Sequence, residues 1–337
     1  MRIQRAAEST AFAKDSRVMS APTPAQEVVN FLPKNLLVPT DFSAESHKAL
    51  NYARAFVERF ASAVHLVHIV EPMPVVAGIE VAPMPLEYPK ELGTFERKLA
   101  ELAKEFSPGS VGRTIVREGS PVDDIVSVAK ELRTDLIIIS SHGHSGIRHV
   151  LFGSTAEGVV RRAPCPVLVL RPQEREFVET AKTTEKRATF SLKTILVPID
   201  FSEGSRRALG YAIAFARQLG AKLICLHVLE VMTYTDPDTT LAAQIQMLRK
   251  SLFETTERTL EGFLKEQSAQ LPRENILTFS SAPREIIQIA EDRRADVILL
   301  AAHGQQAGPG RFLLGSTAER VLRHAPCPVL IVKESES

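Results

Sequence analysis

The chain has 337 residues, of which 44% are hydrophobic and 24% charged, and its net charge is +1. This composition is typical of a globular protein, and the length exceeds the roughly 100 to 200 residues of one domain. A net charge near zero gives no general attraction to nucleic acid or to a membrane surface, so we expect neither as a partner.

Residues 1–33 come first in chain order. Charged residues such as Arg2, Glu8, Lys14 and Asp15 interrupt them throughout, and they contain no apolar run long enough for a signal peptide or a membrane span. We expect a flexible N-terminal tail.

Residues 34–171 alternate between short apolar runs and segments with helical periodicity. The first helical segment places Ala49, Ala53 and Phe56 on one face. Several prolines in 72–89 predict an exposed loop. We expect strands at 35–40, 64–70, 111–117, 135–140 and 166–170, and helices at 43–60, 91–106, 123–132 and 154–162.

Residues 172–191 are rich in glutamate, lysine and arginine, which predicts a charged linker. Residues 192–334 then repeat the pattern of the first half, with strands expected at 194–199, 223–229, 276–279, 296–301 and 328–332. Short apolar strands separated by helices favour an α/β fold in which helices cover both faces of a parallel sheet.

The two halves share sequence motifs in the same order. Leu-Val-Pro-Thr-Asp-Phe-Ser at 37–43 recurs as Leu-Val-Pro-Ile-Asp-Phe-Ser at 196–202, and Ala-Pro-Cys-Pro-Val-Leu recurs before the last strand of each half. The offset between the aspartates is 200 − 41 = 159. This is an internal duplication, and each copy predicts one domain.

The chain contains three cysteines, Cys165, Cys225 and Cys327, two of which occupy equivalent positions in the repeats. This is not the dense, even set of a secreted disulfide scaffold, so we expect a reducing, cytoplasmic location. Small buried hydrophobic side chains are the expected role of Cys165 and Cys327, with a redox role as the alternative.

These motifs together resemble the universal stress protein family, in two tandem copies. The resemblance rests on Pro-Thr-Asp-Phe-Ser after the first strand, Leu-His-Val at the second, and Ser-His-Gly, nine residues and Gly-Ser after the fourth. It implies a five-stranded doubly wound domain of strand order 3-2-1-4-5, with an adenine nucleotide often bound at the tips of strands 1 and 4.

General physical reasoning places a ligand at the same location. In that strand order the winding reverses between strands 1 and 4, and ligands of such sheets bind outside their carboxyl ends. Gly143, Gly153 and the helix beginning near Ser154 and Thr155 provide backbone N–H groups that attract phosphate. The alternative is structural, with Gly153 as a turn residue and Ser154 as a helix N-cap.

Asp41 is the candidate ligand at the end of the first strand. A carboxylate there can hydrogen-bond a ribose hydroxyl or hold a magnesium ion that bridges phosphates. The alternative is a cap for the following helix, but Ser43 is the better N-cap and would release Asp41 for the ligand.

The resemblance implies the remaining contacts. Pro39, Thr40 and Ile69 would line the adenine, and Ile139 and Ser140 would lie along the ribose. The matching positions of the second half are Pro198, Ile199, Asp200, Val228, Leu300, Ala301, Gly304, Gly315, Ser316 and Thr317.

Three departures from the family pattern concern this site. Ser140 and Ala301 stand where the family has glycine, so the conformational freedom of glycine is lost. Ile199 replaces the hydroxyl of Thr40. The second glycine loop holds ten residues instead of nine. We therefore favour nucleotide binding by the first half over the second.

Other kinds of site are less supported. His142, His144 and His149 are close in sequence, but no carboxylate or cysteine accompanies them, so we expect no metal site. The positive charges at 161–162 and 323–324 lie near helix C-termini, where they complement the helix dipole. The chain has no Gly-x-x-x-x-Gly-Lys-Ser/Thr loop and no catalytic group that we can identify, which predicts a protein that is not an enzyme apart from weak incidental ATP hydrolysis.

Two functions remain. The first is a cytoplasmic stress-response regulator with tandem domains that bind ATP, with or without magnesium. The second is an interaction or scaffold protein that has lost nucleotide binding in one or both halves. We expect the two domains to pack through their fifth strands, and a homodimer is left open.

Overall fold

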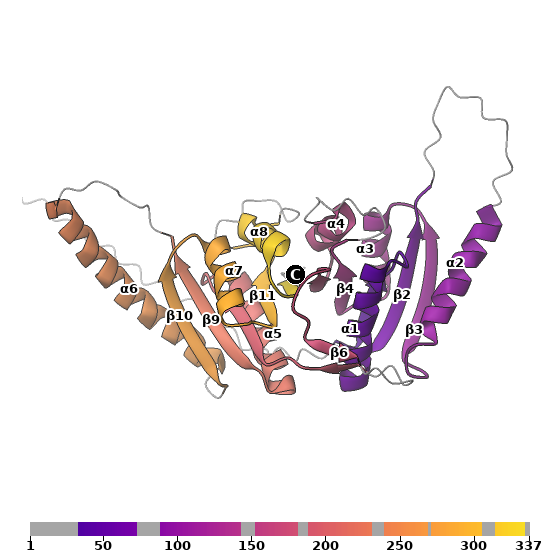
Figure 1. The fold of residues 1–337 in the computed structure, drawn as a ribbon, viewed down its shortest axis with the longest axis horizontal. Helices are drawn as coiled ribbons and strands as arrows, with labels where there is room; N and C mark the ends of the chain where they lie inside the picture. The colour runs from indigo at the N-terminus through magenta and orange to yellow at the C-terminus, as the bar shows by residue number, and fades with distance from the viewer. Residues whose placement is uncertain are drawn as a thin grey trace, which may run out of the picture.

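The computed structural model describes residues 33–72, 88–142, 152–180, 188–230, 239–268, 271–304 and 314–333. Within these ranges the chain forms two five-stranded units, which join edge to edge into one ten-stranded sheet (Figure 1). The expected tail before residue 33 and most of the expected loop at 72–89 lie outside the described residues.

The first half contains the strands and helices that its periodicity predicts. The strands are β1 (Asn35–Pro39), β2 (Ala63–Val70), β3 (Val111–Glu118), β4 (Leu136–Ser140) and β5 (Val167–Leu170), and the helices are α1 (Ala44–Phe60), α2 (Tyr88–Ala103), α3 (Pro121–Glu131) and α4 (Ser154–Arg162).

The second half repeats this series. The strands are β8 (Thr194–Pro198), β9 (Lys222–Leu229), β10 (Arg273–Phe279), β11 (Val297–Ala301) and β12 (Val329–Val332), and the helices are α5 (Glu203–Leu219), α6 (Thr239–Ser268), α7 (Ala282–Asp292) and α8 (Ser316–His324).

The strand order of the whole sheet is β10-β9-β8-β11-β12-β5-β4-β1-β2-β3. Within each half all neighbouring strands are parallel and the order is 3-2-1-4-5, which confirms the predicted fold class. The winding reverses between β1 and β4 and between β8 and β11, so each half has one topological switch point.

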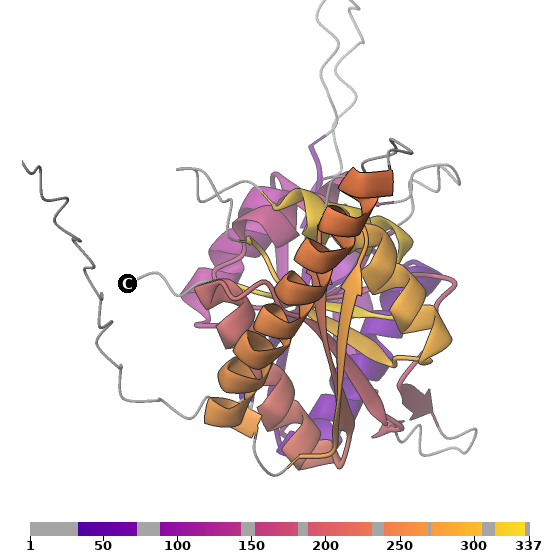
Figure 2. The ribbon, with the colours of Figure 1, turned by 90° about the vertical axis from the view of Figure 1, so that its left-hand side faces the viewer.

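Helices cover both faces of the sheet because successive strand residues point to opposite sides. Leu36 and Val38 belong to a core cluster with α1, α2, α5 and α6, whereas Leu37 belongs to a second cluster with α3, α4, α7 and α8. Figure 2 shows the long α6 crossing the strands of the second half obliquely. Each cluster contains residues of both halves.

The halves meet where β5 pairs with β12 in antiparallel register, with Leu168 opposite Leu330. Cations at equivalent repeat positions, Arg171 and Lys333, follow these strands. The guanidinium of Arg171 donates to the carbonyl of Ala325, and Lys333 Nζ donates to the carbonyl of Arg161 at 3.0 Å. Each half therefore places a positive charge at the C-terminus of a helix of the other half, where it complements the helix dipole.

The segment 172–191 differs from the charged linker expected from its composition. It contains two short antiparallel strands, β6 (Val178–Thr180) and β7 (Ala188–Phe190), which lie beside α1 (Figure 1). Phe177 and Ala188 are buried, and Glu174 is buried in an ion pair with Lys48. The prediction weighed the many charges and missed the apolar residues between them.

In the part of the chain that the structure describes, no helix combines the length and apolarity needed to cross a membrane.

Candidate functional site

Pairing between β1 and β4 ends early at the switch point of the first half, which is where a ligand crevice is expected. Only Leu36 and Leu37 of β1 pair with β4, opposite Leu136 and Ile137. Beyond these two pairs the strands are not paired, so Thr40, which follows β1, and Ser140, the last residue of β4, are not joined by the sheet. Doubly wound sheets bind ligands at such carboxyl ends.

The turn from β1 into α1 has an unusual backbone. Phe42 has φ 65°, in the left-handed region that residues other than glycine and asparagine rarely adopt. The Phe42 N–H donates to Thr40 Oγ1 at 3.0 Å, and that hydroxyl also hydrogen-bonds Ser46 Oγ at 2.9 Å. Thr40, which is 5% exposed, thus fixes the turn that presents Asp41.

Ser43 is the N-cap of α1, as predicted, because its Oγ accepts the N–H of Ser46 at 3.1 Å. Asp41 nevertheless has a local role. Its Oδ1 accepts the N–H of Ser43 at 3.0 Å and the hydroxyl of Ser43 at 2.6 Å. The sequence predicted either capping or ligand binding for Asp41. In the structure Asp41 is not the cap, and Ser43 holds the Oδ1 atom of Asp41 in a fixed direction.

His68 of β2 is a site residue that sequence reasoning missed. Its Nδ1 hydrogen-bonds the carbonyl of Thr40 at 2.8 Å, and its ring packs 4.7 Å from the ring of Phe42. Burial lowers the pKa of His68, which favours the neutral imidazole. The signal was present in the repeat, since His227 makes the same contact with the carbonyl of Ile199 at 2.7 Å.

The opposite wall follows β4. Ser140 Oγ donates to the carbonyl of His142 at 2.7 Å, so the residue in place of the family glycine is used inside the loop. Gly153 rather than Ser154 is the N-cap of α4, which contradicts the structural alternative for Ser154. A Cβ at Gly153 would lie 2.7 Å from the carbonyl oxygen of Ser141, so this close approach requires glycine.

Ser154 is the first residue of α4, and its side chain is exposed. The first N–H groups of a helix have no partner within it and favour an anion. Thr155, Pro39 and Ile69 are half-buried, and Ile139 is buried with 5% exposure. Gly143 lies outside the described residues.

The second half has the same turn. Phe201 has φ 64°, and Asp200 Oδ1 accepts the N–H of Ser202 at 3.0 Å and its hydroxyl at 2.5 Å. Here the loop after β11 is described as far as Gly304. A Cβ at Gly304 would lie 2.6 Å from Asp200 Oδ2, so the aspartate and the glycine loop are packed together.

The other predicted residues of the second half occupy matching places. Gly315 is the N-cap of α8, and Ser316 and Thr317 begin that helix. The side chain of Ile199 is buried with 3% exposure. Pro198 and Val228 are half-buried, and Leu300 and Ala301 are buried.

Comparison with known proteins identifies the family. The model of the universal stress protein family matches residues 33–171 and again residues 191–333. The chain belongs to the universal stress protein family.

Relatives support the tandem arrangement. A universal stress protein of Mycobacterium tuberculosis is 24% identical over 312 residues, which cover 89% of this chain and 97% of that protein. A universal stress protein of Methanocaldococcus jannaschii is 32% identical over 146 residues, covering 42% of this chain and 85% of that protein.

A solved universal stress protein from Archaeoglobus fulgidus has the same fold. It matches with a TM-score of 0.61 at 22% identity and covers 90% of this chain and 97% of that chain.

One of the three histidines weighed as metal ligands lies within the described residues of this universal stress protein. His142 Nδ1 contacts the hydroxyl of Ser141 at 2.8 Å, whereas His144 and His149 lie outside the described residues. Among the residues that are described, no three histidine, cysteine or acidic side chains are grouped so that they could hold a metal ion.

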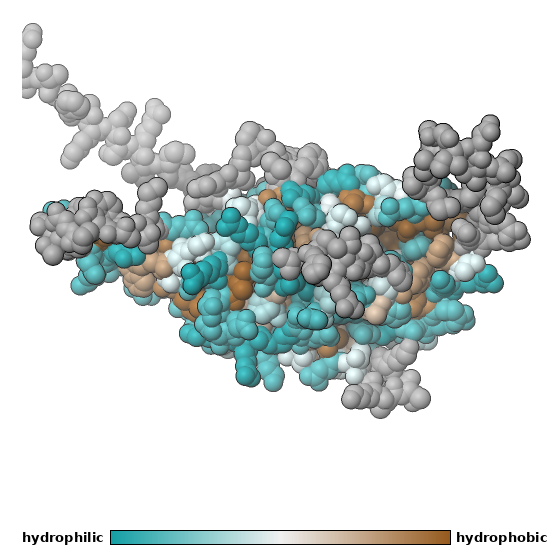
Figure 3. All heavy atoms as spheres, turned by 45° about the horizontal axis from the view of Figure 1, so that its top comes forward, coloured by the Kyte–Doolittle hydropathy of each residue, from teal (hydrophilic) through white to brown (hydrophobic). Residues whose placement is uncertain are grey.

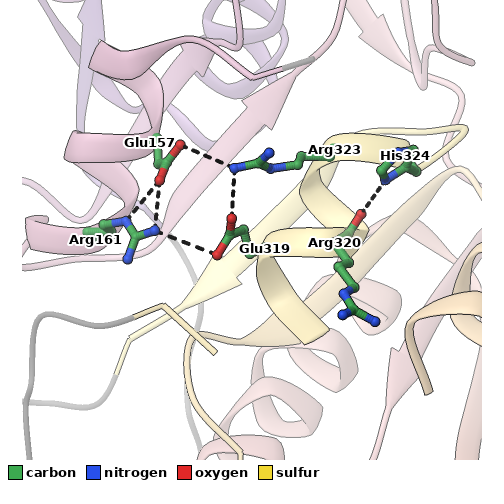
Figure 4. A network of polar contacts seen from close by, with 6 residues as sticks. All are labelled: Glu157, Arg161, Glu319, Arg320, Arg323 and His324. Carbon is green, nitrogen blue, oxygen red and sulfur yellow. Dashed lines mark hydrogen bonds and ion pairs between the residues drawn. The ribbon is translucent and has the colours of Figure 1, made fainter. Parts of the chain in front are cut away.

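The basic residues at the ends of α4 and α8 have a more specific role than the predicted dipole complement. Glu157 and Arg161 of α4 and Glu319 and Arg323 of α8 form a four-membered ion-pair network across the two halves (Figure 4). The cross-half distances are 3.6 Å and 3.8 Å, longer than the 2.7 Å pairs within each helix.

All three cysteines are buried and unbridged. Burial raises the pKa of Cys165 and of Cys225 to about 12 and raises the pKa of Cys327 further. Protonated, enclosed thiols suit the predicted role of small hydrophobic side chains.

A hollow near Arg54 does not belong to the expected crevice. It is lined by Ser62 and Ser110, which precede β2 and β3, and therefore opens at the amino ends of the strands. Figure 3 turns the side where the strands end toward the viewer. Most of the residues visible on this side are hydrophilic.

Proposed function

We propose that this universal stress protein is a cytoplasmic regulator in which the first half binds an adenine nucleotide, ATP with or without magnesium. One observation carries this proposal. Pairing between β1 and β4 ends before their carboxyl ends, where Asp41 follows β1 and the chain after β4 leads to the N-terminus of α4.

The polar groups of the first half suit the parts of a nucleotide. The N-terminus of α4, with Ser154 and Thr155, would attract the phosphates. Asp41 would accept a ribose hydroxyl, because it directly follows β1 and Ser43 holds its Oδ1 in a fixed direction. Pro39, Thr40 and Ile69 would contact the adenine.

The second half is a weaker candidate. Ile199 supplies no hydroxyl, and the glycine loop after β11 is one residue longer than the loop after β4. We therefore propose one effective nucleotide site in each chain. We also propose that the halves remain joined through β5 and β12 in solution.

Calorimetric titration with ATP and magnesium tests this proposal, using the wild type, Asp41→Ala and Asp200→Ala. The two variants are matched, because each removes the carboxylate that accepts from a helix N-cap serine. We expect Asp41→Ala to abolish the binding heat and Asp200→Ala to retain it. Wild type that gives no heat and carries no nucleotide after purification would overturn the proposal.

One observation favours the alternative function of a scaffold without nucleotide. Ser140 replaces the family glycine, and its hydroxyl binds the carbonyl of His142 within the loop. If the wild type binds ATP poorly and Ser140→Gly binds it tightly, the scaffold gains support. Ala301→Gly is the matched change in the second half.

A further inference from the structure

The internal repeat extends further upstream than the matched family domains. With the offset of the aspartates, 159, Lys193 corresponds to Lys34 and Phe190 corresponds to Phe31. The family matches begin at residues 33 and 191, so both phenylalanines lie outside them. Phe190 is described in β7, whereas Phe31 precedes the described residues.

The chain enters the first strand of each half in the same way. In both halves the backbone N–H groups of two successive residues donate to a single aspartate oxygen. The distances to Asp135 Oδ2 are 2.9 and 2.8 Å, and those to Asp296 Oδ2 are 2.7 and 2.8 Å. The preceding residues, Pro33 and Leu192, are both buried. The direction of the chain just before each strand is therefore also repeated.

Phe190 shows where such an upstream segment goes. Although β7 leads into the second half, it lies beside α1 of the first half (Figure 1). The Phe190 ring packs edge-on against Phe56, with centroids 5.1 Å apart, and lies 5.8 Å from Phe60. The ring also lies 6.2 Å from Phe215 of α5, so the segment reaches α1 of the other half at the aromatic cluster between the two helices.

The axis that relates the halves runs close to this cluster. Phe56 of α1 and Phe215 of α5 are equivalent in the repeat, and their rings stack 6.0 Å apart at 13°. The surface of α1 beneath β7 therefore has a counterpart on α5, formed by Tyr211, Ala214 and Leu219. These apolar residues are half-buried, while Tyr52 and Ala55, the equivalents of the first two, are at most 1% exposed.

We propose that residues 28–32 dock on α5, with Phe31 on the surface formed by Tyr211, Ala214 and Leu219. This position is related to that of Phe190 on α1 by the axis between the halves. The distance along the chain allows it. Leu32 alone separates Phe31 from buried Pro33, as Ser191 alone separates Phe190 from buried Leu192. The apolar sequence Val28-Val29-Asn30-Phe31-Leu32 suits an apolar helix face. This docking is independent of nucleotide binding.

Cysteine cross-linking tests the location. Phe31→Cys with Leu219→Cys is the test pair, and Phe190→Cys with Phe60→Cys is its described equivalent. Phe31→Cys with Phe60→Cys is the negative control. A short thiol cross-linker reaches these sites selectively, because the native cysteines are buried. We expect the test pair to cross-link within one chain as efficiently as the equivalent pair.

Two outcomes would overturn the proposal. One is a test pair that cross-links no better than the negative control. The other is a product that joins two chains, which would mean that a second copy supplies the segment.

A measurement of thermal stability tests the same docking if a double cysteine variant fails to fold. We expect Phe31→Ala to lower the melting temperature by on the order of 3 °C or more, as expected when a packed aromatic side chain is lost. Phe12→Ala is the control, since it removes the same side chain far from the repeat. Equal melting temperatures for the two variants would contradict the docking.

Discussion

Two equivalent glycines lie in unequally tight surroundings. A Cβ at Gly153 would lie 2.7 Å from a backbone oxygen, whereas at Gly315 the matching distance is 3.3 Å. Both glycines have ordinary negative φ values and both are helix N-caps, so the penalty for alanine at a cap is shared and the Cβ contact distinguishes the two positions. We expect Gly153→Ala to lower the free energy of unfolding by about 1–3 kcal/mol and Gly315→Ala by less than about 1 kcal/mol. Urea denaturation measures both.

Gly262 is the control for this comparison. It lies in α6 with no atom within 4 Å of an added Cβ. Alanine there should raise the free energy of unfolding by about 1 kcal/mol, because glycine is the poorer helix former. Equal losses for Gly153→Ala and Gly315→Ala would show that the close contact does not matter.

For single residues, the sequence predicts a local role such as helix capping better than a contact between distant parts of the chain. The capping role of Ser43 was predictable, because a serine preceding an apolar helical pattern is a local signal. The contact between Asp200 and Gly304 was not, since it depends on how two strand ends more than a hundred residues apart are placed. The bond from His68 to Thr40 was missed although His68 recurs as His227 in the repeat.

Among the secondary elements, the segment that joins the halves holds an unusual carboxyl group. The side chain of Glu174 is 0% exposed and lies 3.0 Å from Lys48 Nζ. Burial raises the pKa of Glu174 from its ordinary value of 4.5 to about 7, against the opposing effects of Lys48 and Arg171. Its ionised form is therefore disfavoured in the folded protein.

The pH dependence of stability follows from the sign of this shift. Between about pH 4.5 and 7 the folded state keeps the Glu174 proton and the unfolded state loses it. The free energy of unfolding should therefore fall as pH rises, by up to about 1.4 kcal/mol per pH unit from this group. We expect Glu174→Gln to reduce that fall in urea denaturations at pH 5, 6 and 7.

Glu176→Gln is the matched control, because Glu176 contacts the same lysine at 3.3 Å but its side chain is 47% exposed. Its pH profile should resemble that of the wild type. A Glu174→Gln profile parallel to the wild type would contradict the assignment.

The same segment marks the limit of prediction from composition. The central strands of each half, such as β1 and β4, were predictable because they are almost entirely apolar and occur twice, whereas the edge strands β3 and β10 contain charged residues. The strands β6 and β7 have three residues each and lie among charges, so neither length nor periodicity indicated them. Their position depends on Phe177 packing against Tyr52 and Phe190 packing against Phe56 of α1, which is a tertiary effect.

Across the whole molecule, apolar burial dominates the contact between the halves. Leu168 and Leu330, opposite each other in β5 and β12, are each 2% exposed. Leu330→Ala should lower the free energy of unfolding by about 2–5 kcal/mol. Replacing Glu157 and Glu319 by glutamine should cost about 1 kcal/mol or less, because those side chains are 25% and 32% exposed.

Both variants and the wild type should unfold in one transition, because each core cluster spans the two halves. Circular dichroism in urea suits this test, since the chain has no tryptophan. Two separate transitions in the wild type would show that the halves are independent units.

The antiparallel pairing of β5 with β12 also has a consequence for inheritance. In an assembly of two identical chains, every substitution is present at both sites at once. Here one polypeptide supplies both halves, so equivalent positions can hold different residues, as Thr40 and Ile199 do. The candidate site of one half can therefore change while that of the other half does not. Every molecule then carries one copy of each site.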